Sequence, residues 1–136
     1  MSKESAFLLL AAVGLVPIAL SYGLMPVESM SFLYAINVDS VELSHIFRAV
    51  MGLYLAMVVF WLVGAYKKSL RPQALWSLTI FMLGLAAGRT LSLLVDGMPH
   101  PLLLAYLLLE IGFGAVGYVL ASRYHPVHEP YPSSRL

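Results

Sequence analysis

Four stretches of about twenty mostly apolar residues dominate this sequence. They cover residues 6–25, 41–65, 74–95 and 102–122, and each is long enough to cross the hydrocarbon core of a bilayer as an α-helix. Only 11% of the residues are charged, whereas a soluble domain carries about 25%. The sequence therefore predicts an all-α membrane protein, a single bundle of four transmembrane helices within residues 1–125.

Composition also excludes several kinds of site. The net charge is +1 and there is no cysteine, so the chain lacks the positive field that attracts nucleic acid and cannot build a thiolate metal site. Of the four histidines, only His45 lies within a predicted span, so a haem held by two histidines would lack its second ligand. We expect no nucleic-acid partner, no metal and no cofactor.

The basic residues outside the spans lie at the N-terminus, in the loop between the second and third spans, and in the tail. With four spans these three segments share one side of the membrane. The loops on the other side, residues 26–40 and 96–101, contain acidic residues and no lysine or arginine. The positive-inside rule therefore predicts cytoplasmic termini. It also predicts that Trp61, Tyr66 and Trp76 lie at the cytoplasmic interface, where amphipathic rings are favoured.

The connections contain recognisable signals. Asp39 and Glu42 have the spacing of a capping box at the start of the second span. The preceding loop includes an apolar segment, residues 30–36. This segment predicts either a short interfacial helix on the membrane surface or a lid over the outer end of the bundle. Three prolines in the last eleven residues predict a flexible cytoplasmic tail at 126–136.

Three charged residues fall well inside the predicted spans, away from their ends. Arg48, Arg89 and Glu110 each lie seven or eight residues from the outer end of their helix, which is roughly 10–12 Å at 1.5 Å per residue. A charge near the bilayer centre costs up to about 3 kcal/mol on insertion scales. Since the three share one depth, we expect the two arginines to flank the glutamate.

Helical spacing extends this cluster along three spans. Residues three or four apart share a helix face, and small residues usually mark faces that meet other helices in membranes. Gly84 and Gly88 form such a pair on the third span. The predicted intramembrane polar cluster, which is also the candidate ligand-binding site, comprises Glu42, His45, Arg48, Arg89, Ser92, Asp96, Tyr106 and Glu110.

Two motifs carry a family resemblance: residues 45–54 (HIFRAVMGLY) and residues 88–97 (GRTLSLLVDG), followed by Tyr106 and Glu110. With them, nearly the whole chain apart from the tail resembles a family of small bacterial four-helix membrane proteins catalogued as a domain of unknown function. The resemblance implies a four-helix fold in the bacterial inner membrane and supplies no reaction. A likeness to DoxX-like proteins rests on architecture alone.

Several functions remain open for the cluster. The first is an internal clamp that sets helix register, in a protein that could be an accessory subunit of a larger membrane complex or a homo-oligomer. The second is an outward-facing pocket for a small anionic or lipid-like ligand, such as a headgroup, a quinone or an isoprenoid, because arginine pairs well with carboxylate and phosphate. The third is a membrane enzyme with His45 or Glu110 as acid or base, and the fourth is a proton or ion path. Membrane lipids are the expected partners in each case.

Overall fold

The computed structural model describes residues 1–125, and the elements within that part of the chain are helices. The predicted tail at 126–136 lies outside the described residues. Four of the helices are long and apolar enough to cross a membrane, which confirms the all-α, four-span prediction. In chain order the elements are α1 (Lys3–Gly23), α2 (Pro26–Tyr34), α3 (Val41–Tyr66), the short 3-10 helix η1 (Lys68–Leu70), α4 (Arg71–Val95) and α5 (Pro101–Arg123).

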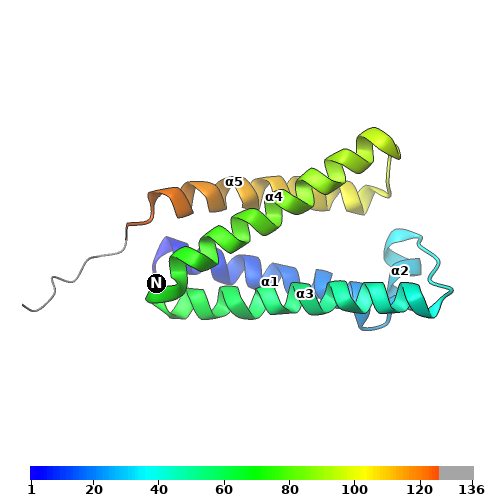
Figure 1. The fold of residues 1–136 in the computed structure, drawn as a ribbon, viewed down its shortest axis with the longest axis horizontal. Helices are drawn as coiled ribbons and strands as arrows, with labels where there is room; N and C mark the ends of the chain where they lie inside the picture. Colours follow the sequence, from blue (N-terminus) through cyan, green and yellow to red (C-terminus); the bar gives the residue numbers. More distant parts are fainter. Residues whose placement is uncertain (126–136) are drawn as a thin grey trace, which may run out of the picture.

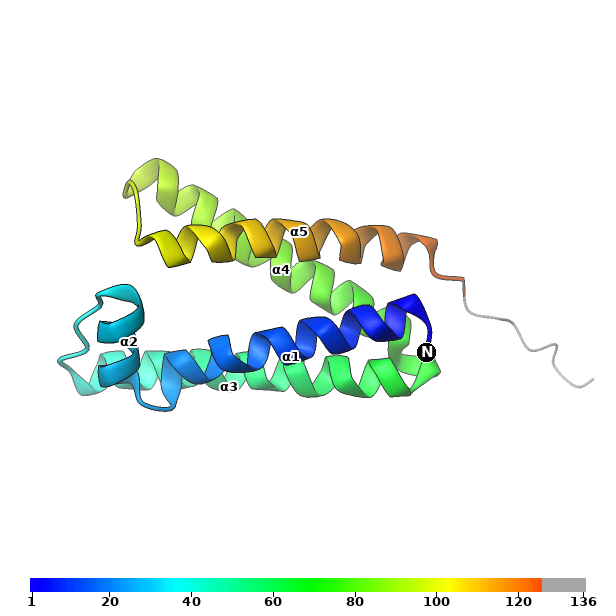
Figure 2. The ribbon, with the colours of Figure 1, turned by 180° about the vertical axis from the view of Figure 1, so that it is seen from behind.

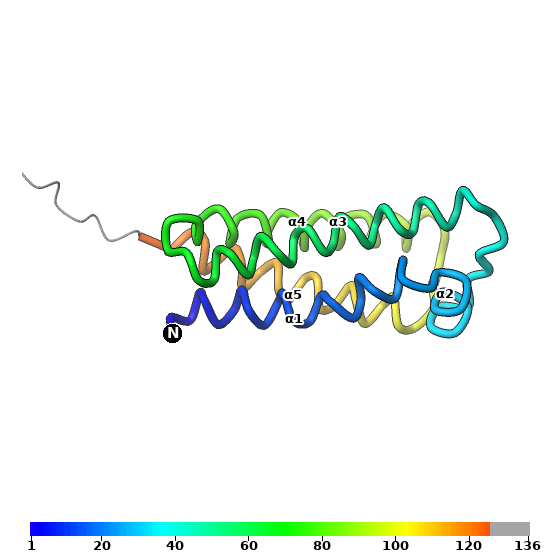
Figure 3. The backbone as a smooth tube through the Cα atoms, turned by 90° about the horizontal axis from the view of Figure 1, so that it is seen from below, coloured from blue at the N-terminus to red at the C-terminus, as the bar shows by residue number. Residues whose placement is uncertain are grey.

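The long helices form two antiparallel pairs, α1 with α3 and α4 with α5. Figures 1 and 2 show that the pairs lie close together at the end where α3 passes through η1 into α4, and spread apart toward the end that carries α2. Figure 3 shows all four long helices extending along one axis between these two ends. Below, the two ends are called the N-terminal end and the α2 end.

Close helix contacts depend on glycines other than the predicted pair. A Cβ on Gly64 would meet the Cβ of Ala74, and a Cβ on Gly117 would lie 2.7 Å from Thr79 Oγ1. By contrast, nothing lies within 4 Å of a Cβ built on Gly84 or Gly88. The expectation that Gly84 and Gly88 mark a packed face is therefore wrong. Small residues permit close approach, but spacing alone does not say which of them a neighbouring helix meets.

The core near the N-terminal end is built around Trp61. Its side chain is fully buried, and its indole N–H donates a hydrogen bond to Ser77 Oγ at 3.1 Å. Trp61 is therefore not one of the exposed rings expected at the membrane interface, because this residue is on the face of α3 that packs against α4 and contacts the ring of Phe81. Tyr66, at the end of the same helix, is exposed as expected.

Arg71, counted as a loop cation in the sequence, is buried at the N-terminal end. Its guanidinium donates hydrogen bonds to the carbonyl oxygens of Gly64 and Ala65, at 3.3 and 2.6 Å, and to Ser2 Oγ at 3.2 Å. A cation is favourable here because the last carbonyls of a helix lack partners within the helix and carry partial negative charge. Arg71 therefore ties the start of α1 to the end of α3.

The connection before α3 differs from the predicted capping box. The N-cap residue is Ser40, whose hydroxyl accepts a hydrogen bond from Leu43 N–H at 3.1 Å. The helix therefore begins one residue later than a cap at Asp39 would require. Serine and aspartate are similarly good N-caps, so the sequence alone left the choice open.

Helix α2 covers the α2 end of the bundle. Met30 and Tyr34 on this helix, together with Val38 after it, are buried against side chains from α1, α3 and α5. Phe32, on the opposite side of α2, is 88% exposed. The structure therefore agrees with the lid interpretation, since one face of α2 covers the end of the bundle, and the opposite face presents an exposed aromatic side chain.

Candidate functional site

The ion pair between Arg89 and Glu110 is the centre of the candidate site. Arg89 Nε donates to both carboxylate oxygens of Glu110, at 2.8 and 2.9 Å. The two residues face each other because α4 and α5 are packed antiparallel neighbours. The Glu110 side chain is 8% exposed and the Arg89 side chain is 21% exposed, so the pair is largely buried inside the bundle. Charge-assisted bonds of this length are among the stronger hydrogen bonds in proteins.

Two tyrosines, one on α1 and one on α5, flank this pair. The hydroxyl of Tyr22, near the end of α1, accepts a hydrogen bond from Arg89 Nη2 at 3.4 Å. The ring of Tyr106 on α5 lies 5.8 Å from the Arg89 guanidinium carbon, within the range of a cation–π interaction. Arginine therefore has three kinds of partner here: a carboxylate, a hydroxyl and an aromatic face.

A chain of hydroxyl groups links the lid to these tyrosines. Tyr34 Oη on α2 lies 3.0 Å from Tyr106 Oη and 2.8 Å from Ser21 Oγ. Burial raises the pKa of Tyr34 to about 12, further above neutral pH than that of an ordinary tyrosine hydroxyl, which is already protonated and able to donate a hydrogen there. The lid helix α2 is therefore joined to the polar cluster by the hydrogen bond between Tyr34 and Tyr106.

Tyr22 and Tyr34 were not among the predicted site residues. Their rings stack with centroids 5.8 Å apart, and Tyr22 also meets the edge of Tyr54 at 5.6 Å. A signal was present in the sequence, because a tyrosine in an apolar loop segment and another at the end of a span are both polar groups in need of partners. Nothing in the spacing indicated that Tyr22 would bond to Arg89 or that Tyr34 would bond to Tyr106.

Arg48 lies apart from the pair, contrary to the expectation that both arginines flank Glu110. Arg48, His45 and Glu42 are exposed on α3. The reason is helical phase: Leu43 and Phe47, which pack under the lid, occupy the side of α3 opposite to His45. Chain position gave the distance of Arg48 from the end of its helix, but it did not determine the direction of the side chain.

Ser92 and Asp96 also lie outside the pair. The Ser92 hydroxyl donates to Asp96 Oδ2 at 2.7 Å, and both residues are exposed at the end of α4. Asp96 therefore does not neutralise Arg89, which leaves Glu110 as the carboxylate that does. Of the eight predicted residues, the structure brings together Arg89, Tyr106 and Glu110, and it distributes the other five over the surfaces of α3 and α4.

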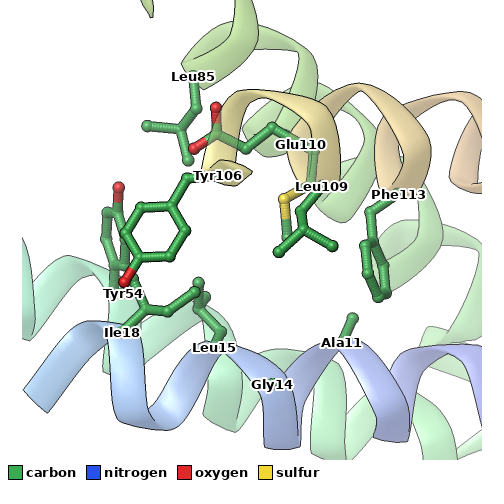
Figure 4. Close-up of a pocket in the computed structure, with 11 residues that line it drawn as sticks. Ala11, Gly14, Leu15, Ile18, Tyr54, Leu85, Tyr106, Leu109, Glu110 and Phe113 are labelled. Carbon is green, nitrogen blue, oxygen red and sulfur yellow. The ribbon is translucent and has the colours of Figure 1, made fainter. Parts of the chain in front are cut away.

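A cavity of about 80 Å³ adjoins the ion pair, between the α1/α3 and α4/α5 pairs. Figure 4 shows Tyr106 and Glu110 on α5, with Leu15 and Gly14 on α1 across the cavity from them. Its wall is mostly apolar, and the polar side chains that line it are those of Tyr54, Tyr106 and Glu110. The remaining lining residues are Ala11, Ile18, Met82, Leu85, Leu109 and Phe113.

Comparison with known proteins gives a family and no activity. No curated protein and no solved structure matches the chain. One family model matches residues 4–121, and it is described as a domain of unknown function, DUF4345. The matched segment includes the ion pair, the lid and almost the full length of the four long helices, and the chain belongs to the DUF4345 family.

Proposed function

We propose that this protein binds a lipid-like molecule through the cavity beside the Arg89–Glu110 pair. The observation that supports it most is that the carboxylate of a buried ion pair lines a cavity. A pair that served as a structural clamp alone would gain from close packing on every side, since interiors normally leave few voids. A binding site instead needs a space next to groups that recognise the ligand.

The lining favours an uncharged polar group on an apolar body. Glu110 already neutralises Arg89, so little attraction for an anion remains, and this is a change from the anionic ligand considered from sequence. The hydroxyls of Tyr54 and Tyr106 can bond a ligand hydroxyl or carbonyl, as found on isoprenoid alcohols and quinones. The volume is below the 150 Å³ or so of a cavity that admits benzene, so only one end of such a molecule would enter.

Filling the cavity provides the test. Gly14 lines it, and a Cβ added to Gly14 would have nothing within 4 Å, whereas Gly84 has equally free space on α4 but lies outside the lining. We expect a neutral lipid-like molecule to co-purify in mild detergent with the wild type and with Gly84→Leu. We expect Gly14→Leu to lose most of it, as measured by mass spectrometry of extracted small molecules.

The comparison of the two leucine variants decides between binding and clamping. Equal retention by Gly14→Leu and Gly84→Leu would show that the molecule binds elsewhere. Absence of any retained molecule from the wild type would favour the clamp, with the protein acting as an accessory subunit.

We also propose that the protein lies in the inner membrane of a bacterium with both termini in the cytoplasm. Lys3, Lys67 and Lys68 lie at the N-terminal end, while Asp39 and Asp96 lie at the α2 end, and positively charged loops remain cytoplasmic. We expect a periplasm-dependent reporter fused after residue 136 to be inactive, and the same reporter inserted after Gly97 to be active. The reverse pattern would overturn the orientation.

A further inference from the structure

We infer that a groove on α3, at the α2 end, binds the headgroup of a zwitterionic aminophospholipid. In this arrangement Arg48 holds the phosphate and Asp39 holds the ammonium group. The groove shares no lining residue with the cavity beside the Arg89–Glu110 pair, so the inference is independent of the proposed cavity ligand.

The position of Arg48 favours a polar partner from outside the described residues. It lies seven residues into a membrane-spanning helix, roughly 10 Å from the helix start, and it is exposed. Within residues 1–125 the ion pair that forms is Arg89–Glu110, and Arg48 has no such partner. A guanidinium cannot lose its charge in a protein, so Arg48 must extend toward the bilayer surface, where lipid phosphates are the available anions.

The groove has the size and lining for a lipid headgroup. Its volume is about 810 Å³, and it runs between α2, the segment that precedes α3, and the first turns of α3. Polar side chains come from Asp39, Ser40, Ser44, His45 and Arg48, and Val27 supplies apolar contact from the lid. Ser44 and His45 can donate further hydrogen bonds to phosphate oxygens beside the arginine.

The order of charges along α3 selects a zwitterionic headgroup over an anionic one. Asp39 precedes the helix and Glu42 is in its first turn, so both acids lie nearer the membrane surface than Arg48. Glu42 and Arg48 are separated by roughly 9 Å along the helix axis. In an aminophospholipid the phosphate is attached to glycerol, next to the hydrocarbon, and the ammonium group lies beyond it. The acid-above-base order therefore matches phosphate on Arg48 and ammonium on Asp39, whereas a purely anionic lipid would meet uncompensated carboxylates.

Titration with two lipids tests both halves of the site. We expect the wild-type protein in mild detergent, followed by native mass spectrometry, to bind phosphatidylethanolamine more tightly than phosphatidylglycerol. Arg48→Met should weaken both lipids about tenfold, the size expected for a lost charge-assisted contact. Asp39→Asn should weaken phosphatidylethanolamine alone and reduce the preference between the two lipids.

Two further variants separate the site from general effects. Arg48→Lys should retain phosphatidylethanolamine within about threefold, because a cation of similar reach remains. Lys67→Met removes an exposed cation at the opposite end of α3 and should leave both affinities unchanged. Since Asp39, Arg48 and Lys67 are all exposed, we expect the four variants at these positions to unfold at the wild-type temperature.

Three outcomes would overturn the inference. The first is wild-type affinity in Arg48→Met. The second is equal affinity for the lipid and for water-soluble glycerophosphoethanolamine, because the groove would then bind a free phosphoester and not a membrane lipid. The third is a wild-type dimer that Arg48→Met converts to monomer without a change in lipid affinity, because the partner of Arg48 would then be a second copy of this chain.

Discussion

Replacing Glu110 by glutamine should destabilise the bundle by about 3–5 kcal/mol, the usual cost of removing one member of a buried ion pair. We expect the loss of stability to lie at the lower end of this range, because separated helices in a membrane also find polar partners. The substitution leaves the Arg89 guanidinium with the Tyr22 hydroxyl and the Tyr106 ring, and neither of these carries a compensating charge. The measurement is the free energy of unfolding in mixed detergent micelles.

A double-mutant cycle tests whether the loss comes from the pair. Arg89→Met combined with Glu110→Leu should recover well over 1 kcal/mol relative to the sum of the single changes, since both charges leave together. Arg48→Met combined with Glu110→Leu is the matched control. Because Arg48 lies on the surface of α3 and not beside Glu110, these two changes should add within about 0.3–0.5 kcal/mol. Coupling of Glu110 to Arg48 and not to Arg89 would contradict the structure.

Adding one methyl group at Gly64 should destabilise the protein by about 1–3 kcal/mol, the range for overpacking a core. The Cβ of Gly64→Ala would meet the Cβ of Ala74, and neither atom can rotate away. The crossing of α3 and α4 would therefore have to widen at the point where Arg71 and Trp61 also connect the two helices. Thermal unfolding in detergent measures the effect.

Two companion variants isolate this contact. Ala74→Gly added to Gly64→Ala should restore much of the stability, because it returns the missing space from the other side. Gly84→Ala makes the same chemical change at a helical position with nothing within 4 Å, so we expect it to be neutral or to stabilise by up to about 1 kcal/mol through helix propensity. Equal destabilisation at Gly64 and Gly84 would mean that the close approach of α3 and α4 is not what limits residue size.

The sequence by itself determined the class of the protein and the number and limits of its spans. The predicted span 41–65 became α3, Val41–Tyr66, and the predicted span 102–122 became α5, Pro101–Arg123. These features follow from local quantities, because the length and polarity of one segment decide whether that segment can cross a bilayer. The depth of Arg89 and Glu110 is local in the same sense, since it depends only on rise per residue.

Only the tertiary structure decided which polar groups meet. Arg48 and Arg89 have similar depths, yet helix packing turns Arg89 toward Glu110 and leaves Arg48 outside. The same packing buried Trp61 and Arg71, which composition and position had assigned to the membrane surface. It also brought Tyr22 to Arg89 and Tyr34 to Tyr106, from two separate helices. The physical reason is that one residue of helical phase rotates a side chain by about 100°, and the neighbour it then meets depends on which helices pair.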